Sequence, residues 1–149
     1  MREESGHTIQ RRIPMATPEY VLRLRESVGH ELLVLPGVSA VIVREGPDGR
    51  ELLLVRRSDN GQWTPVTGIV DPGEEPAVAA AREALEEADV RIEVRRLLSV
   101  EVVGPVTYDN GDVTTYLDVA FAAEWVSGEP SPADGENSET AFFRGDQLP

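Results

Sequence analysis

The spacing of apolar residues predicts an amphipathic helix close to the start of the chain. Thr17 is the expected N-cap, Pro18 the first helical residue and Gly29 the residue that stops the helix. Four apolar residues share one face of this helix: Tyr20, Val21, Leu24 and Val28. The preceding residues 1–16 are polar and show no period, so we expect a flexible N-terminal segment there.

Strand-length segments separated by turns make up most of the remaining chain. The segments expected to be extended are 32–44, 51–57, 63–70, 90–103, 114–125 and 141–144. Clusters of Gly, Pro, Asn and Asp predict turns at 46–49, 59–61 and 109–112, and a polar loop at 127–138. No apolar run approaches the roughly 18 residues that a membrane-spanning helix needs.

The clearest predicted helix is 76–88. It is rich in Ala and Glu and opens with Pro76 in its first turn. Spacings of three and four residues define its expected apolar face, which carries Val78, Ala81, Leu85 and Ala88. Strands on both sides of one strong helix are typical of a mixed α/β or α+β fold, here expected as a single domain over 17–149.

The composition fits one globular domain and removes several classes of chemistry. With 149 residues, the chain is long enough to bury a hydrophobic core without disulfides. The absence of cysteine excludes disulfide frameworks, cysteine zinc sites and thiol nucleophiles, and two histidines give little support to a histidine metal site. All 14 basic residues are arginine, which excludes lysine Schiff-base, P-loop and kinase-type chemistry.

The charge of the chain narrows its expected partners and location. A formal net charge of −13 argues against nucleic acid or an anionic membrane as a partner. An acidic chain that handles a phosphate compound needs a metal ion or a local group of arginines to offset repulsion. The N-terminus lacks the apolar core of a secretory signal, so we expect a cytoplasmic protein.

The helix predicted at 76–88 carries three carboxylates, Glu83, Glu86 and Glu87. Residues three and four apart on a helix are neighbours, so these side chains project towards one patch. Like charges at this spacing are unfavourable unless a group such as Mg²⁺ or Mn²⁺, which prefers oxygen ligands, compensates them. The alternative is an ordinary solvated acidic face, on which Arg82 and Glu86 form a common pair four residues apart.

A fixed pattern of Gly, Glu and Arg extends from residue 68 to residue 90. It reads Gly, five residues, Glu, seven residues, Arg-Glu, two residues and Glu-Glu, with fixed positions at Gly68, Glu74, Arg82, Glu83, Glu86 and Glu87. With residue frequencies of about 10%, six such identities arise by chance roughly 10⁻⁶ times per starting position. The segment, with Ala84 and Val90 in its apolar positions, resembles the Nudix box.

Two positions depart from the family pattern. Asp89 replaces the last glycine of the box, just past the helix, where a left-handed conformation is favoured. Asp tolerates that conformation better than most residues, so we expect a cost below about 1 kcal/mol and no loss of chemistry. Thr67 stands where family members usually have the first glycine of a Gly-Gly pair, although Gly68 is kept.

The resemblance implies a fold, a reaction and a set of roles. The fold is an α/β/α sandwich around a mixed β-sheet, and the reaction is hydrolysis of a pyrophosphate bond in a nucleoside diphosphate joined to another group. The implied cofactor is Mg²⁺ (or Mn²⁺). Its implied ligands are the carbonyl of Gly68 and the carboxylates of Glu83, Glu86 and Glu87. Arg82 completes the implied catalytic residues by holding Glu83 or Glu74 in place.

Several roles remain open at this level. The general base is either Glu83 or a loop acid such as Glu136 or Glu139. Arg56 and Arg57 are candidates for phosphate contacts, but consecutive strand residues face opposite sides, so at most one points inward. Trp63 is a candidate for stacking on a nucleobase, with ordinary packing as the alternative.

The substrate class is only weakly marked. Pro105 lies where some ADP-ribose pyrophosphatases of the family have a proline, and Tyr108 lies near a tyrosine position of diadenosine polyphosphate hydrolases. A nucleoside triphosphate is a further possible substrate. The rival functions are a Nudix-fold nucleotide-binding or regulatory module without turnover and a divalent-cation binder with no nucleotide role. The expected partner is a small nucleotide-type molecule, and the N-terminal helix is a candidate contact for a homodimer.

Overall fold

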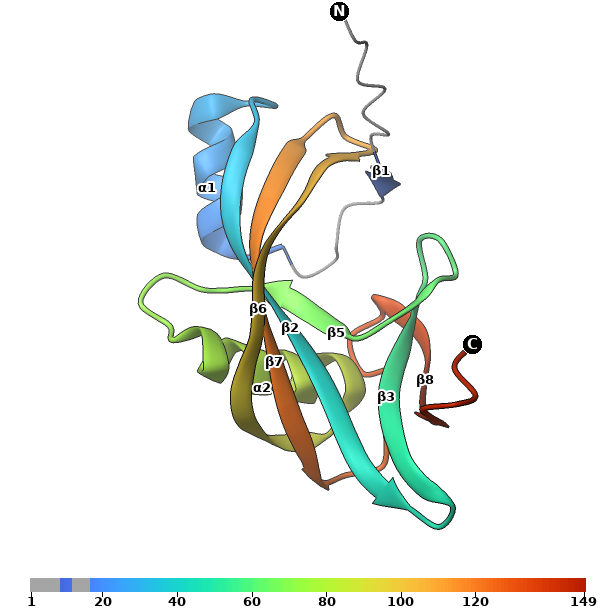
Figure 1. The fold of residues 1–149 in the computed structure, drawn as a ribbon. Helices are drawn as coiled ribbons and strands as arrows, with labels where there is room; N and C mark the ends of the chain where they lie inside the picture. The colour runs from blue at the N-terminus through green and yellow to red at the C-terminus, as the bar shows by residue number, and fades with distance from the viewer. Residues whose placement is uncertain (1–8, 12–16) are drawn as a thin grey trace, which may run out of the picture.

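One mixed β-sheet organises the chain. The computed structural model describes residues 9–11 and 17–149. In these residues the sheet has eight strands, and two helices accompany it (Figure 1). The elements are β1 (Ile9–Arg11), α1 (Glu19–Val28), β2 (Leu33–Gly46), β3 (Gly49–Arg57), β4 (Trp63–Thr64), β5 (Val66–Ile69), α2 (Pro76–Ala88), β6 (Arg91–Tyr108), β7 (Val113–Ser127) and β8 (Asn137–Arg144).

The long strand β2 has two different neighbours along one of its edges. Its other edge runs parallel to β7 from residue 33 to residue 43. On the first edge, residues 37–40 pair with β5 and residues 43–46 pair with β3, both antiparallel. β3 continues away from β2 and pairs with β8, so β5 and β3 lead in different directions (Figure 1). Near the point where the two strands separate, the end of β3, the strand β5 and helix α2 lie close to one another.

Helix α2 has the predicted bounds but not the predicted buried face. Its buried residues are Ala79, Ala80, Ala84, Glu87 and Ala88. By contrast Val78 is 58% exposed and Leu85 40% exposed, so the expected apolar face was wrong at these two positions. The reason is that α2 packs on β5, β6 and β2 through small alanines, which let the helix approach the sheet closely. This orientation turns Glu87 inward.

Helix α1 is held by polar contacts more than by its apolar face. It begins at Glu19 with Pro18 as the N-cap residue, one position later than predicted, and ends at Gly29 as expected. Only Val21 of the predicted face is buried, while Leu24 and Val28 are exposed. The Tyr20 hydroxyl donates to Val70 O at 2.9 Å, beside the start of the loop that leads into α2.

Several strands extend beyond the predicted limits. β6 and β7 form one long hairpin around the predicted 109–112 turn. β8 begins four residues before the predicted 141, because Asn137 and the polar residues after it pair with the end of β3. Of the predicted flexible segment 1–16, only Ile9–Arg11 belongs to the described residues, and it forms β1 parallel to β6. Neither helix of the described chain is long and apolar enough to cross a membrane.

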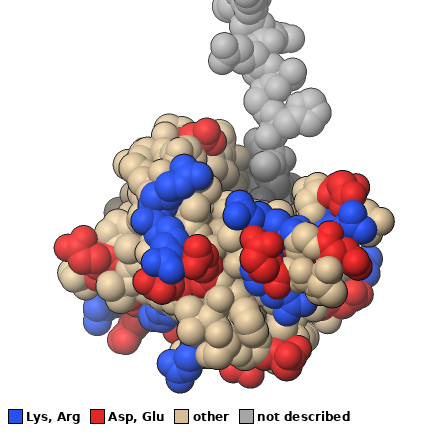
Figure 2. Space-filling view, turned by 60° about the horizontal axis from the view of Figure 1, so that its bottom comes forward, with Lys and Arg blue, Asp and Glu red and all other residues tan. Residues whose placement is uncertain are grey.

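Surface charges are largely arranged in opposite pairs. Arg44 lies 2.6 Å from Glu51, Arg95 lies 2.8 Å from Glu124, and other arginines form similar pairs. Figure 2 shows arginine and acidic side chains interleaved over one face of the molecule. Arginines therefore offset many of the negative charges locally, although the net charge of the chain is −13.

Candidate functional site

Arg82, in the middle of α2, is the centre of a hydrogen-bonded network that reaches the loop before the helix. Its guanidinium donates two hydrogen bonds to the carboxylate of Glu74, each of 2.9 Å, and one to Ile69 O at 3.0 Å. It also donates to Glu83 at 3.0 Å and to Glu86 at 3.2 Å. The hydrogen bonds from Arg82 lower the pKa of Glu74. The expectation that Arg82 holds Glu74 or Glu83 therefore agrees with contacts to both.

Glu83 is positioned against the backbone of β5. A Cβ atom at Gly68 would overlap the Glu83 side chain, so glycine is required for this close approach. Burial raises the pKa of Glu83 to about 7, against the opposing effect of the Arg82 charge. Glu83 is thus a carboxyl group that loses its proton near neutral pH.

Glu87 is the most deeply buried carboxyl group of the helix, with 3% of its surface exposed. Burial raises its pKa strongly, and the neighbouring carboxylates of Glu136 and Glu83 raise it further. A buried acid of this kind is costly in its charged form unless a cation or hydrogen-bond donors compensate it.

The polar loop after β7 brings two more acids to Glu87. Backbone N–H groups of Ser131 and Ala133 donate to carbonyls at the C-terminal end of α2, at 3.0 and 3.3 Å. The loop is then tied to β3, because the Ser58 N–H donates to Glu136 O at 3.0 Å. These backbone contacts fix the loop against both the helix and the sheet.

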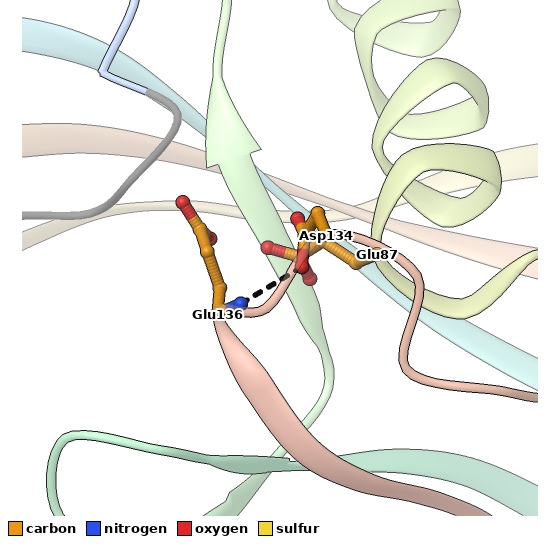
Figure 3. Close-up of side chains that lie close together, drawn as sticks. All are labelled: Glu87, Asp134 and Glu136. Atoms are coloured by element: carbon orange, nitrogen blue, oxygen red, sulfur yellow. Dashed lines mark hydrogen bonds between the residues drawn. The ribbon is translucent and has the colours of Figure 1, made fainter.

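The loop and the helix together form an acidic cluster of Glu87, Asp134 and Glu136. One carboxylate oxygen from each residue lies within 4.8 Å of the others. Figure 3 shows Glu87 on α2 and the other two on the loop, with the Glu136 N–H donating to Asp134 at 3.0 Å. Three carboxylates at this spacing fit Mg²⁺ or Mn²⁺, which take oxygen ligands. The residues present therefore suit the implied divalent metal.

A pocket of about 190 Å³ opens beside this cluster. Glu83, Glu87 and Glu136 line one end of it, next to Gly68 and Thr67 of β5. Glu86 does not line this pocket in the described chain, and instead borders a neighbouring depression together with Arg82 and Asp71. The box residues are thus brought together, with Glu86 on the outer side.

The residues predicted to contact substrate are separated by the structure. Arg57 lines the pocket, and its guanidinium makes two hydrogen bonds of 3.0 Å to Asp59. Arg56 lies on the other side of the strand, where it pairs with Glu139 at 2.9 Å. Trp63 is not among the residues that line the described pocket, and packs edge-on against Phe143 at 5.0 Å between ring centres.

Sequence reasoning missed several residues of the pocket. Asp134 joins the acidic cluster, although nothing in its local sequence distinguishes it from other loop acids. Ser39, Tyr116 and Asp118 line the pocket from β2 and β7. Only the polar positions inside strands β2 and β7 hinted at them, because a buried strand normally carries apolar residues there.

Asp89 and Thr67 occupy the positions where the box departs from the family pattern. Asp89 has φ 55° and ψ 36°, the left-handed conformation that the sequence predicted for this position. Thr67 lies in β5 opposite Ser39 and lines the pocket. The backbone of the box is therefore formed despite both departures.

Comparisons with known proteins agree with this arrangement. The NUDIX domain family model matches residues 35–149, which is most of the chain. The chain is similar to a MutT-like protein of Streptomyces ambofaciens, with 46% identity over 63 residues, covering 42% of this chain and 39% of that protein. It is also similar to 8-oxo-dGDP phosphatase NUDT18 of Homo sapiens, with 29% identity over 139 residues, covering 91% of this chain and 38% of that protein. The chain thus spans less than half the length of these two relatives.

A solved structure shows the same fold. The MutT NUDIX hydrolase from Burkholderia pseudomallei has a TM-score of 0.63 and 29% identity, covering 78% of this chain and 88% of that chain. The predicted α/β fold around a mixed sheet is confirmed by this likeness. On the family model, the fold and the six matching Gly, Glu and Arg positions of the box, the chain belongs to the Nudix hydrolase family.

Proposed function

We propose that this chain hydrolyses a pyrophosphate bond in a nucleoside diphosphate joined to another group, and that it needs Mg²⁺ or Mn²⁺. The observation that carries the proposal is a set of carboxylates beside the pocket, of which Glu87 is buried and Glu83, Asp134 and Glu136 are half-buried. Such a set attracts a divalent cation, and a pyrophosphate needs that cation before it can approach so much negative charge. The family membership and the name of the human relative support the nucleotide class of substrate.

The proposed metal ligands come from β5, α2 and the loop after β7. They are the carbonyl oxygen of Gly68 and the carboxylates of Glu83, Glu86 and Glu87, with Glu136 added from the loop. A bound divalent cation supplies screening of the pyrophosphate charge and acidifies a bound water. The raised pKa values of Glu83 and Glu87 in the metal-free protein are what a cation would reverse.

The proton acceptor is proposed to be Glu83 or Glu136. Both line the pocket, and Glu83 has a pKa of about 7, so it can accept a proton near neutral pH. Glu139 is a weaker candidate, because it pairs with Arg56 on the side of β3 away from the pocket. Arg82 acts by positioning, since its hydrogen bonds orient Glu74, Glu83 and Glu86.

Arg57 is the proposed phosphate contact. It lines the pocket with its guanidinium oriented by Asp59, and it faces the acidic end where the pyrophosphate would lie. We further propose a small nucleotide-type partner rather than nucleic acid or a membrane, a cytoplasmic location, and one domain over 17–149. A homodimer and nucleobase stacking on Trp63 remain proposals, and the position of Trp63 outside the pocket lining does not favour the second.

The first test is phosphate release over a substrate panel with and without Mg²⁺. The panel holds ADP-ribose, NADH, diadenosine polyphosphates, nucleotide sugars and nucleoside triphosphates. We expect turnover of at least one of these, dependent on the metal and lost in Glu87→Gln. Glu124→Gln is a matched control, because Glu124 is an exposed carboxylate paired with Arg95. Tight nucleotide binding without turnover on the whole panel would contradict the proposal and favour a binding module.

A further inference from the structure

Part of the pocket lining comes from the sheet rather than from α2, and adjoins Gly68. We call this part the sheet end; its residues are Gly37, Ser39, Val103, Tyr108, Tyr116 and Asp118. Gly37 lies opposite Asp118 across β2 and β7, and Tyr116 lies opposite Val103 across β7 and β6. One pocket therefore joins an acidic end to an end that offers tyrosine and valine side chains and a single carboxylate.

The carboxylate of Asp118 is held in place by one hydrogen bond and can accept further ones. The Ser39 hydroxyl donates to its Oδ2 at 2.9 Å. Its Oδ1 has no hydrogen-bond partner among the described residues, and a Cβ at Gly37 would lie 3.2 Å from it and 3.6 Å from Gly68 O. Because residue 37 is glycine, the space between Asp118 and the Gly68 carbonyl stays open.

The chemistry of this end differs from that of the acidic cluster. A single carboxylate repels phosphate and accepts hydrogen bonds, so it calls for a donor on the ligand rather than for a phosphate oxygen. Burial deprives the Asp118 carboxyl of part of its hydration and so raises its pKa. Tyr116, whose hydroxyl is hydrogen-bonded to that of Tyr108, and Val103 offer apolar surface to a ring beside it.

We propose that Asp118, oriented by Ser39, determines specificity for the nucleoside part of the ligand by accepting a hydrogen bond from it. The donor is a ribose hydroxyl or a base N–H group. This inference rests on the proposed function, which places the pyrophosphate at the acidic end and leaves the nucleoside to the sheet end. A ligand without such a donor leaves the half-buried carboxylate unpaired and binds more weakly.

The test is equilibrium binding in the presence of Ca²⁺, measured by calorimetry on the full chain. The probes are ATP, GTP, CTP and UTP, with inorganic tripolyphosphate as the probe that lacks a nucleoside. We expect at least one nucleotide to bind wild-type protein about tenfold or more tightly than tripolyphosphate. In Asp118→Asn this advantage should fall by about tenfold or more, with tripolyphosphate binding unchanged.

A matched control and a set of analogues complete the test. Glu101→Gln removes the charge that faces Asp118 across the strand pair but is not part of the pocket lining, so the nucleoside advantage should be kept. The 2′-deoxy and 2′,3′-dideoxy forms of the preferred nucleotide test for a ribose donor, and the comparison among the four bases tests for a base donor. Thermal unfolding confirms that each variant is folded.

Three results would overturn the inference. The first is that no nucleotide binds wild-type protein more tightly than tripolyphosphate does. The second is that Asp118→Asn weakens the binding of nucleotide and of tripolyphosphate alike. The third is that Asp118→Asn changes the binding of neither. These outcomes are independent of turnover with Mg²⁺. Loss of turnover alone contradicts the proposed function, while loss of the nucleoside advantage alone contradicts the role of Asp118.

Discussion

Two groups of carboxylates lie on or beside α2 and have opposite electrostatic surroundings. At the start of the helix, Glu74 receives two hydrogen bonds from Arg82, which lower its pKa. At the other end, Glu87 faces Asp134 and Glu136, and burial with these like charges raises its pKa. Glu83 lies between, bonded to Arg82 but buried enough to have a pKa of about 7.

The difference separates carboxylates that stabilise the fold from carboxylates that take part in the proposed chemistry. Glu74 receives two hydrogen bonds from an arginine, so it stabilises the fold and has little to gain from a cation. A buried carboxylate that faces other carboxylates destabilises the metal-free fold and gains most from a cation. The comparison thus assigns the pair of Arg82 and Glu74 to holding the helix and the preceding loop in place, and the Glu87 cluster to the proposed metal.

The largest expected effect is the loss of turnover in Glu87→Gln. The change removes a proposed metal ligand while keeping the size of the side chain, so kcat/KM should fall by about 10²- to 10³-fold. Steady-state phosphate release on the best substrate of the panel measures this. Glu124→Gln should retain wild-type activity. A Glu87→Gln variant with full metal-dependent activity would place the metal elsewhere.

The pH dependence of stability should differ with and without metal. The folded-state pKa of Glu83 is about 7, above its unfolded value, so its contribution is present at low pH and is lost as the pH rises from about 4.5 through 7. Metal-free protein should therefore lose about 2 kcal/mol of unfolding free energy between pH 5 and pH 8 from this group. Urea unfolding of wild-type protein and of Glu83→Gln in EDTA gives this contribution as the difference between the two, because the raised pKa of Glu87 adds a loss of the same sign.

Unfolding in the presence of Mg²⁺ gives a second test of the same pH dependence. Metal binding requires deprotonated carboxylates, so Mg²⁺ should raise the unfolding midpoint more at pH 8 than at pH 6. Glu74 has the opposite sign, because its pKa is lowered and its contribution is lost only as the pH falls below about 4. An equal effect of Mg²⁺ at both pH values would argue against the Glu83–Glu87 region as the binding site.

Stability changes of opposite sign are expected for the two ends of α2. Glu74→Gln should destabilise metal-free protein at pH 7 by about 1.5 kcal/mol, because it weakens the charged hydrogen bonds from Arg82. Glu87→Gln should stabilise it by about 1 kcal/mol, because it removes a buried carboxyl group that the folded state must keep protonated at this pH. Urea unfolding of both variants in EDTA gives the sign of each change in unfolding free energy. Destabilisation by both substitutions would contradict the predicted difference between Glu74 and Glu87.

The smallest expected effect is on metal affinity in Gly68→Ala. The added Cβ overlaps the Glu83 side chain, which must move away from β5. We expect Mg²⁺ to bind about tenfold more weakly, as for other changes that misplace a metal ligand. Gly145→Ala is the matched control, since its Cβ meets no atom within 4 Å and its backbone is not left-handed. Calorimetric titration with Mg²⁺ compares the two, and equal affinities would show that Glu83 is not held by position 68.

Local sequence was sufficient to predict the elements that depend on neighbouring residues. The bounds of α2, the stop at Gly29, and the left-handed Asp89 follow from spacing, capping and backbone preference. The convergence of Glu74, Arg82 and Glu83 also follows, because helix periodicity and one short loop bring them together. These features involve residues close in sequence, so few alternative arrangements exist.

Only the tertiary structure decided which residues from distant segments complete the site. Periodicity placed Val78 and Leu85 on the inner face, but the close approach of alanines to the sheet turned Glu87 inward instead. Asp134 reaches Glu87 because the loop satisfies carbonyls at the end of α2, and Asp118 meets Ser39 because β7 runs beside β2. The sequence by itself determined the chemistry of the helix, since that chemistry is a matter of local spacing. Packing and strand pairing determined the surroundings of the helix, since those surroundings depend on contacts between segments that are far apart along the chain.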